Sequence, residues 1–241
     1  MESSSPATPP TRTDRILAIM AKAPRPGLVK TRLAASLPSS AVSALYRCLL
    51  DDTIALAQSV GGVEAAIVCP AADVDDLVRI VGGAIRVVAQ AGEGLAPGLQ
   101  STFAHFTAAG DRRVVAFNSD SPHLPASVLK GAFEALAACD LIVGPTHDGG
   151  YYLVGAKSNH SGLFDGDRMG TASALEALLA RARALRLSVR LTDPFYDIDV
   201  AGDLIRLAAE LRIDPARAPR TAAWLKEWEQ EVDRLRPDMK K

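Results

Sequence analysis

The segment 15–33 has the sequence RILAIMAKAPRPGLVKTRL, in which a short apolar run leads directly into a loop rich in cations. The run at 15–21 predicts a buried strand. Similar apolar runs recur along the chain at 65–69, 85–90, 113–119 and 140–146. Because segments with a helical period separate several of them, we predict an α/β fold in which a mostly parallel central sheet is flanked by helices.

Helices are predicted where apolar residues recur every three or four positions. The clearest begins at the possible caps Ser39 and Ser40. Ser173 and Glu176 have the spacing of a capping box, which predicts the start of another helix. The remaining expected elements are strands at 151–156 and 188–192 and helices at 129–136, 204–211 and 224–235.

The length and composition of the chain favour one large globular domain. Its 241 residues are 48% hydrophobic and 23% charged, a balance that supplies a substantial core. We expect a disordered leader at 1–13, which is rich in Ser, Thr and Pro. A single domain at 14–220 and a terminal helix and tail at 221–241 are expected to follow.

Charge, hydropathy and cysteine content disfavour several classes of protein. The formal net charge is -1 and no basic run is sustained, so we expect no nucleic acid as a partner. We also expect no insertion into a membrane, because no apolar stretch approaches the roughly 20 residues of a spanning helix. Cys48, Cys69 and Cys139 are odd in number and lack C-x-x-C spacing, which indicates reduced thiols in a cytoplasmic protein.

The loop after the first predicted strand carries Lys22, Arg25, Lys30 and Arg32 and no acid. Ligands of open α/β sheets bind beyond the carboxyl ends of the strands, so this loop is well placed to hold phosphates. Gly27 would let the backbone approach a ligand closely. The loop matches neither the P-loop pattern nor G-x-G-x-x-G, which disfavours an ATPase or a dinucleotide enzyme. A solvated basic turn is the alternative.

Three aspartates in two later segments are candidate metal ligands. Asp120 follows the strand predicted at 113–119, where a carboxylate would face the ligand crevice and could bind Mg²⁺. The alternative is a turn that precedes a helix. Asp197 and Asp199 lie on the same side of an extended segment, so one of them could face the metal. Alternatively, Asp199 caps the helix that follows.

The segment 144–153, GPTHDGGYYL, places polar residues and glycines between two predicted strands. A hairpin turn explains Asp148 and Gly149 without any function. The addition of His147 and Gly150 could instead make a pocket for an acceptor group. The two tyrosines that follow are candidates for this pocket or for the core.

Together and in this order, these segments resemble a bacterial family described as radical-SAM/selenodomain-associated transferases, or as uncharacterised glycosyltransferase-A-like transferases. The resemblance covers about 16–211 and implies the nucleotide-diphospho-sugar transferase (GT-A, Rossmann-like) fold. The motifs that carry it are K-A-P-x-P-G-x-V-K-T-R-L at 22–33, S-D-x-P-x-L at 119–124, G-P-x-x-D-G-G-Y-Y-L at 144–153 and D-I-D at 197–199.

The resemblance also implies roles for individual residues. The wider superfamily contains phospholactate guanylyltransferases and molybdenum-cofactor nucleotidyltransferases, in which the basic loop holds a triphosphate and the acids hold magnesium. Similarity to them implies nucleotide binding by Lys22, Arg25, Gly27, Lys30, Gly94 and Gln100. It further implies Mg²⁺ on Asp120 and Asp199, where Mn²⁺ is the alternative ion. From the residues themselves, we predict the acceptor site at His147, Asp148, Gly149 and Gly150.

The chain departs from these relatives at two places. Val200, Ala201 and Gly202 replace a common Thr-Pro-Glu sequence, which could weaken the helix cap behind Asp199. The segment 169–171, Met-Gly-Thr, stands where this family often has a tryptophan, which could alter the acceptor pocket.

The favoured hypothesis is nucleotidyl transfer from a nucleoside triphosphate to a small phosphorylated or otherwise anionic acceptor. Lys30, Arg32 and Asp120 are the predicted catalytic residues, because charge neutralisation and positioning carry such reactions. Glycosyl transfer from a nucleotide-sugar is the first alternative, although the chain lacks a D-x-D sequence at position 120 and its cationic loop suits a triphosphate. A nucleotide-binding protein without turnover is the second.

Overall fold

The structure is a computed structural model that describes residues 13–108, 113–165 and 173–236. The expected leader lies outside the described residues apart from Thr13, and so does the end of the expected tail at 237–241. The departure from the family at 169–171 also lies outside them.

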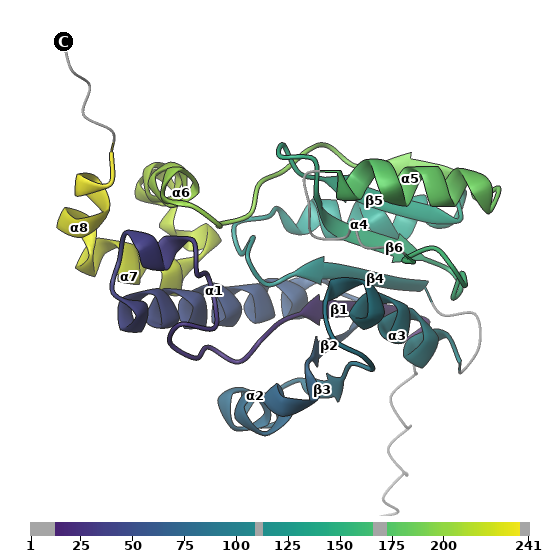
Figure 1. Ribbon diagram of the computed structural model, residues 1–241, viewed down its shortest axis with the longest axis horizontal. Coiled ribbons are helices and arrows are strands. Elements are labelled where there is room, and N and C mark those ends of the chain that lie inside the picture. Colours follow the sequence, from purple (N-terminus) through teal and green to yellow (C-terminus); the bar gives the residue numbers. More distant parts are fainter. Residues whose placement is uncertain (1–12, 109–112, 166–172, 237–241) are drawn as a thin grey trace, which may run out of the picture.

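Seven strands form one sheet in the order β3-β2-β1-β4-β6-β5-β7 (Figure 1). They are β1 (Arg15–Met20), β2 (Glu64–Cys69), β3 (Arg86–Ala89), β4 (Arg113–Asn118), β5 (Leu141–Pro145), β6 (Tyr151–Ala156) and β7 (Val189–Leu191). All neighbouring pairs are parallel except those of β6, which runs antiparallel to β4 and β5. The predicted fold class, a mostly parallel sheet flanked by helices, is confirmed.

The helices connect the strands and continue beyond the last one. They are α1 (Ser39–Ser59), α2 (Val74–Val81), α3 (Leu95–Thr107), α4 (Ala126–Ala135), α5 (Ala174–Ala184), α6 (Ala201–Ile213), α7 (Pro219–Glu227) and α8 (Glu229–Arg234). Short 3-10 turns are η1 (Leu33–Ala35), η2 (Ala71–Asp73) and η3 (Pro215–Arg217). Among these helices, none combines the length and the apolarity needed to cross a membrane.

The sequence did not predict α2 and α3, and it predicted one terminal helix where α7 and α8 are separated at Trp228. Pro97 and Gly98 are typical of a loop, yet both lie in the first turn of α3. The missing N–H of a proline costs no hydrogen bond in that turn. The expected helix at 224–235 was wrong in its continuity.

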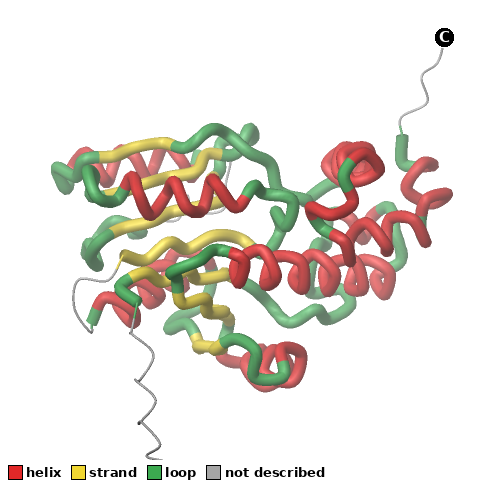
Figure 2. The backbone as a smooth tube through the Cα atoms, turned by 180° about the vertical axis from the view of Figure 1, so that it is seen from behind, coloured by secondary structure: helices red, strands yellow, loops and turns green. Residues whose placement is uncertain are grey.

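Helices cover both faces of the sheet, which is why the central strands are apolar at almost every position (Figure 2). Leu17 and Ile19 of β1 belong to an apolar cluster that includes residues of α1, α2 and α4. Ile16 and Ala18, on the opposite face, belong to a cluster that includes residues of α3 and α5. Because its side chains alternate between the two faces of the sheet, β1 contributes to both apolar clusters.

A third apolar cluster lies between α1, η1 and the helices α6, α7 and α8. Trp224 is buried in it and stacks on Trp228 with ring centroids 5.4 Å apart. The carboxylate of Asp52 on α1 accepts hydrogen bonds from the backbone N–H of Arg220 and from the backbone N–H and hydroxyl of Thr221. The last helices are thereby fixed to the main body of the molecule.

Two glycines allow the packing of the sheet to be tested with a single type of substitution. A Cβ atom at Gly155 in β6 would lie 2.7 Å from Ile142 and 2.9 Å from Val115, whereas one at Gly131 in α4 would meet no atom within 4 Å. We expect Gly155→Ala to lower the free energy of unfolding by about 1–3 kcal/mol because it overpacks the core.

The matched variant Gly131→Ala is expected to raise the free energy of unfolding by about 0.5–1 kcal/mol, because alanine restricts the unfolded chain and favours the helix. Urea denaturation of both variants checks the pair. Equal effects at the two positions would contradict the packing described for β6.

Candidate functional site

A cavity of about 890 Å³ opens where β1, β2, β3 and β4 end. The loop after β1 contributes Lys22, Lys30 and Arg32, and the loop after β4 contributes Asp120. Asp199, which precedes α6, lines the same cavity although it lies far away in the sequence. The structure therefore brings the predicted catalytic residues and both predicted metal ligands around one space.

Lys30 connects the basic loop to the acids. Its Nζ atom lies 2.7 Å from a carboxylate oxygen of Asp120 and 2.8 Å from one of Asp199, and its side chain is only 5% exposed. Burial by itself would lower the pKa of this ammonium group, but the two carboxylates outweigh burial and the pKa is raised. Lys30 is therefore a charged group held between two acids.

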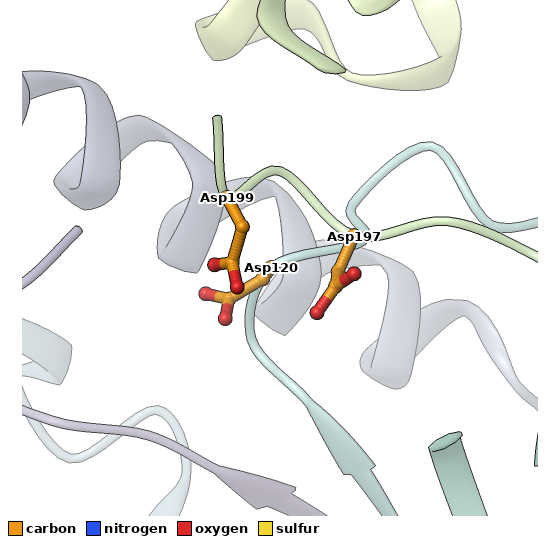
Figure 3. A group of neighbouring side chains, drawn as sticks. All are labelled: Asp120, Asp197 and Asp199. Atoms are coloured by element: carbon orange, nitrogen blue, oxygen red, sulfur yellow. The ribbon is translucent and has the colours of Figure 1, made fainter. Parts of the chain in front are cut away.

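Asp120, Asp197 and Asp199 form an acid trio, in which one carboxylate oxygen of each residue lies within 4.8 Å of the others (Figure 3). Burial, and then repulsion by Asp199, raise the pKa of Asp197 to about 6. The sequence placed only one of the two later aspartates at the metal. The fold brings both of them next to Asp120.

Contacts between the two acid-bearing loops fix the trio. The backbone N–H of Ile198 donates to the carbonyl of Asp120 at 3.1 Å. The Ser121 hydroxyl donates to the carbonyl of Tyr196 at 3.1 Å. These two bonds join the segment after β4 to the segment before α6, so the spacing of the acids is set by backbone as well as by side chains.

The alternative role of Asp199 as a helix cap is not what the structure shows. The carboxylate of Asp203 accepts the backbone N–H groups of Asp199 and Val200, at 3.0 Å and 2.9 Å. Asp203 thus caps α6 despite the departure from the family sequence at 200–202. The carboxylate of Asp199 is turned instead toward Lys30 and toward Arg32, which lies 3.6 Å away.

Side chains of α1 hold the roots of both loops. The Tyr46 hydroxyl accepts the backbone N–H of Lys22 at 3.0 Å and shares a 2.9 Å hydrogen bond with the Ser119 hydroxyl. The Ser43 hydroxyl donates to the carbonyl of Pro24 at 2.7 Å. Sequence reasoning missed Ser43 and Tyr46, although the signal was present as polar residues three positions apart on an otherwise apolar helix face.

Two predicted nucleotide-binding residues of the basic loop lie apart from the cavity lining. The guanidinium group of Arg25 pairs with Asp73 at 2.7 Å and also with Asp76, and neither Arg25 nor Gly27 lines the cavity. Gly27 has φ +77, a conformation that favours glycine, so the turn explains its presence. Lys22 and Lys30 do line the cavity.

Only one of the two predicted base-binding residues lines the cavity. Gly94 lines the cavity, but Gln100 lies on α3 and its amide donates to Asn159 at 2.5 Å. Gln90, which sequence reasoning missed, lines the cavity and donates from Nε2 to the carbonyls of Gly92 and Gly94, at 3.0 Å and 3.2 Å. Gln90 therefore shapes the rim that Gly94 occupies.

The predicted acceptor segment forms the turn between β5 and β6. The Asp148 carboxylate accepts the Thr146 hydroxyl at 2.5 Å and the backbone N–H of Gly150 at 3.2 Å. The first of these hydrogen bonds is the main reason that the pKa of Asp148 is lowered. A hairpin turn accounts for Asp148 and Gly149. None of the four predicted acceptor residues, 147–150, lines the cavity. Their role toward an acceptor stays a prediction.

Residues 53–171 match a family model. The family is described as "Uncharacterized protein conserved in bacteria (DUF2064)". No curated protein matches the sequence of the chain.

Solved structures with similar folds include three from different organisms. One from Desulfovibrio desulfuricans G20, provisionally named a nucleotide-diphospho-sugar transferase, is 27% identical with a TM-score of 0.87, over 94% of this chain and 100% of that chain. A 4-diphosphocytidyl-2C-methyl-D-erythritol synthase from Anaerococcus prevotii DSM 20548 is 15% identical with a TM-score of 0.54, over 82% and 96%. A nucleotidyl transferase from Methanothermobacter thermautotrophicus is 16% identical with a TM-score of 0.54, over 83% and 99%.

These matches confirm the resemblance found in the motifs and the nucleotide-diphospho-sugar transferase fold that it implies. The two structures under 20% identity share the fold.

His123 packs against the two aromatic residues that directly precede Asp197. Its ring is buried and lies 4.5 Å from the ring of Tyr196 and 4.9 Å from that of Phe195, measured between centroids. Burial, and then the charges of Arg217 and Arg206, lower the pKa of His123 to about 3. The imidazole is therefore neutral in the folded protein near neutral pH.

This shift predicts how stability depends on pH. Between pH 6.5 and about 3, the unfolded chain binds a proton at His123 that the folded chain does not. The free energy of unfolding should therefore decrease as the pH falls below 6.5, with a slope from this residue of up to about 1.4 kcal/mol per pH unit. His123→Phe should remove that part of the slope, which urea denaturation at pH 7.5 and pH 4.5 measures. Parallel pH profiles for the two proteins would contradict it.

Proposed function

We propose that the chain is a metal-dependent nucleotidyltransferase, which moves a nucleoside monophosphate from a nucleoside triphosphate to a small phosphorylated or otherwise anionic acceptor. One observation carries the proposal: cations and carboxylates face the same cavity. Lys22, Lys30 and Arg32 approach it from the loop after β1, and Asp120 and Asp199 line it from other loops. A polyphosphate that binds together with a divalent cation requires both charges at once.

The acid trio fits a divalent cation. Carboxylate oxygens are the ligands that Mg²⁺ and Mn²⁺ favour, and Asp120, Asp197 and Asp199 offer three of them within 4.8 Å of one another. A bound Mg²⁺ or Mn²⁺ would neutralise negative charge on the phosphate oxygens. Both predicted ligands, Asp120 and Asp199, line the cavity, which supports a metal site beside the proposed nucleotide site.

The residues of the chain would act by holding and neutralising the phosphates. An oxyanion of the acceptor attacks the α-phosphorus, the bond from that phosphorus to the bridging oxygen breaks, and pyrophosphate leaves with the bonding electrons. Lys30 and Arg32 are placed to neutralise the charge that develops on the leaving group. Because the acceptor is already anionic, no side chain has to remove a proton from it.

The rim formed by Gln90 and the segment 92–95 is the proposed place for the base of the nucleotide. It lines the same cavity as the cations but comes from the loop after β3. The carbonyls of Gly92 and Gly94 already accept hydrogen bonds from Gln90. The shape of the rim therefore depends on an amide that is itself part of the cavity wall.

Glycosyl transfer from a nucleotide-sugar is the second candidate, and one observation favours it. The relative with 27% identity carries the name of a nucleotide-diphospho-sugar transferase. Three cations of one loop, Lys22, Lys30 and Arg32, line the cavity, and this favours the larger negative charge of a triphosphate over that of a nucleotide-sugar. We therefore rank nucleotidyl transfer first.

The test separates the products of the two reactions. Purified protein with Mg²⁺ is screened with the four ribonucleoside triphosphates and common nucleotide-sugars against a library of phosphorylated acceptors, and pyrophosphate and nucleoside diphosphate are detected separately. We expect pyrophosphate, formed at a rate that Asp120→Asn lowers roughly 100-fold, because this carboxylate holds charge at the reacting phosphates.

The matched control is Asp75→Asn, which removes an exposed carboxylate of α2 outside the cavity. It should leave the rate unchanged. Release of nucleoside diphosphate from a nucleotide-sugar without pyrophosphate would make the protein a glycosyltransferase. Binding of nucleotide without either product would make it a binding protein.

A further inference from the structure

The ammonium group of Lys30 pairs with two of the three acids that the proposed function assigns to a divalent cation. Its Nζ atom lies 2.7 Å from Asp120 and 2.8 Å from Asp199. Its side chain is 5% exposed, although those of the two acids are 23% and 40% exposed. A cation from the chain itself therefore already satisfies the carboxylates that the proposed function assigns to a metal.

The backbone directs Lys30 inward. The residue has φ 48, a left-handed conformation that residues other than glycine adopt rarely. Its carbonyl accepts the backbone N–H groups of Leu33 and Ala34, at 2.9 Å and 3.2 Å, so the root of the side chain is fixed at the start of η1. Strained backbone of this kind persists where surrounding interactions over-determine it.

The ammonium group retains the capacity to bind a ligand. It has three N–H donors, and the contacts with Asp120 and Asp199 use two of them. Lys30 also lines the cavity. Phosphates in the cavity would therefore offer Lys30 new anionic partners without a movement of the backbone, since the four-carbon stem is flexible.

We infer that Lys30 is an internal counter-ion, which occupies Asp120 and Asp199 in the free protein and gives them up when phosphates of a nucleotide bind. The inference rests on the proposed function, because it assigns the acid trio to a divalent metal. Metal binding and nucleotide binding are then coupled: nucleotide must strengthen the binding of metal, and by linkage metal must strengthen the binding of nucleotide by the same factor. Metal alone competes with a buried lysine and binds weakly.

Mn²⁺ alone is the probe that tests this competition. The affinity of the full-length protein for Mn²⁺, without nucleotide, is measured by titration calorimetry for the wild type, Lys30→Met and Lys22→Met. Lys22 lines the same cavity, and in the described part of the chain no carboxylate lies within salt-bridge distance of its ammonium group. Both substitutions remove one positive charge from the cavity, but only the first removes the group that competes for the acids.

We expect Lys30→Met to bind Mn²⁺ about tenfold more tightly, or better, than both the wild type and Lys22→Met, because it leaves two partly buried carboxylates without a counter-ion. Affinities of the two variants within a factor of about two of each other would overturn the inference, since general electrostatics would then explain any gain. Absence of Mn²⁺ binding in all three proteins would overturn it as well. Lys30→Gln, which keeps a hydrogen-bond donor at this position, decides by the same criterion if circular dichroism shows that Lys30→Met is unfolded.

The outcome is independent of the catalytic assay. If pyrophosphate is released from a nucleoside triphosphate but Lys30→Met gains no affinity for Mn²⁺, nucleotidyl transfer stands and the counter-ion role of Lys30 is wrong. If Lys30→Met gains affinity but no nucleoside triphosphate is consumed, the counter-ion role stands and the proposed function is wrong.

Discussion

Four neighbouring strands, β3, β2, β1 and β4, run in the same direction, and this constraint decides which loops surround the cavity. Parallel strands end at one edge of a sheet, so the loops that follow them must meet there. β1 lies between β2 and β4, which places its basic loop at the centre of that edge. The loop after β4 brings Asp120 to the same edge. The antiparallel strand β6 then separates this half of the sheet from β5 and β7.

The charges gathered at this edge have to be balanced within the protein. Lys30 is almost fully buried and would be costly to place there without Asp120 and Asp199, just as the three clustered carboxylates would repel one another without a cation. The same balance explains the chemistry that we propose. A nucleotide with a divalent cation carries both signs of charge, and it can exchange partners with a site in which both signs are already paired.

Contacts outside the cavity hold the loops of this site in place. Helix α1 fixes the basic loop and the end of β4 through Tyr46, and it also anchors α7 through Asp52. Asp203 caps α6 and leaves the Asp199 carboxylate available to Lys30. The neutral imidazole of His123 packs behind the acid-bearing segment. The loops that line the cavity are therefore held by groups outside it.

The sequence by itself determined the seven strands, the α/β class and the charged motifs of the loops, because apolar runs, helical periods and short motifs are local properties of the chain. It missed the helices α2 and α3. The first turn of α3 contains a proline and a glycine, which are typical of a loop. Only the tertiary structure decided which charged groups work together. Arg25 pairs with Asp76, 51 positions away, whereas Lys30 reaches Asp199, 169 positions away. Gln90 rather than Gln100 lines the cavity, and Asp197 joins the acids. Such pairings depend on the order and direction of the strands, which no local pattern of residues specifies.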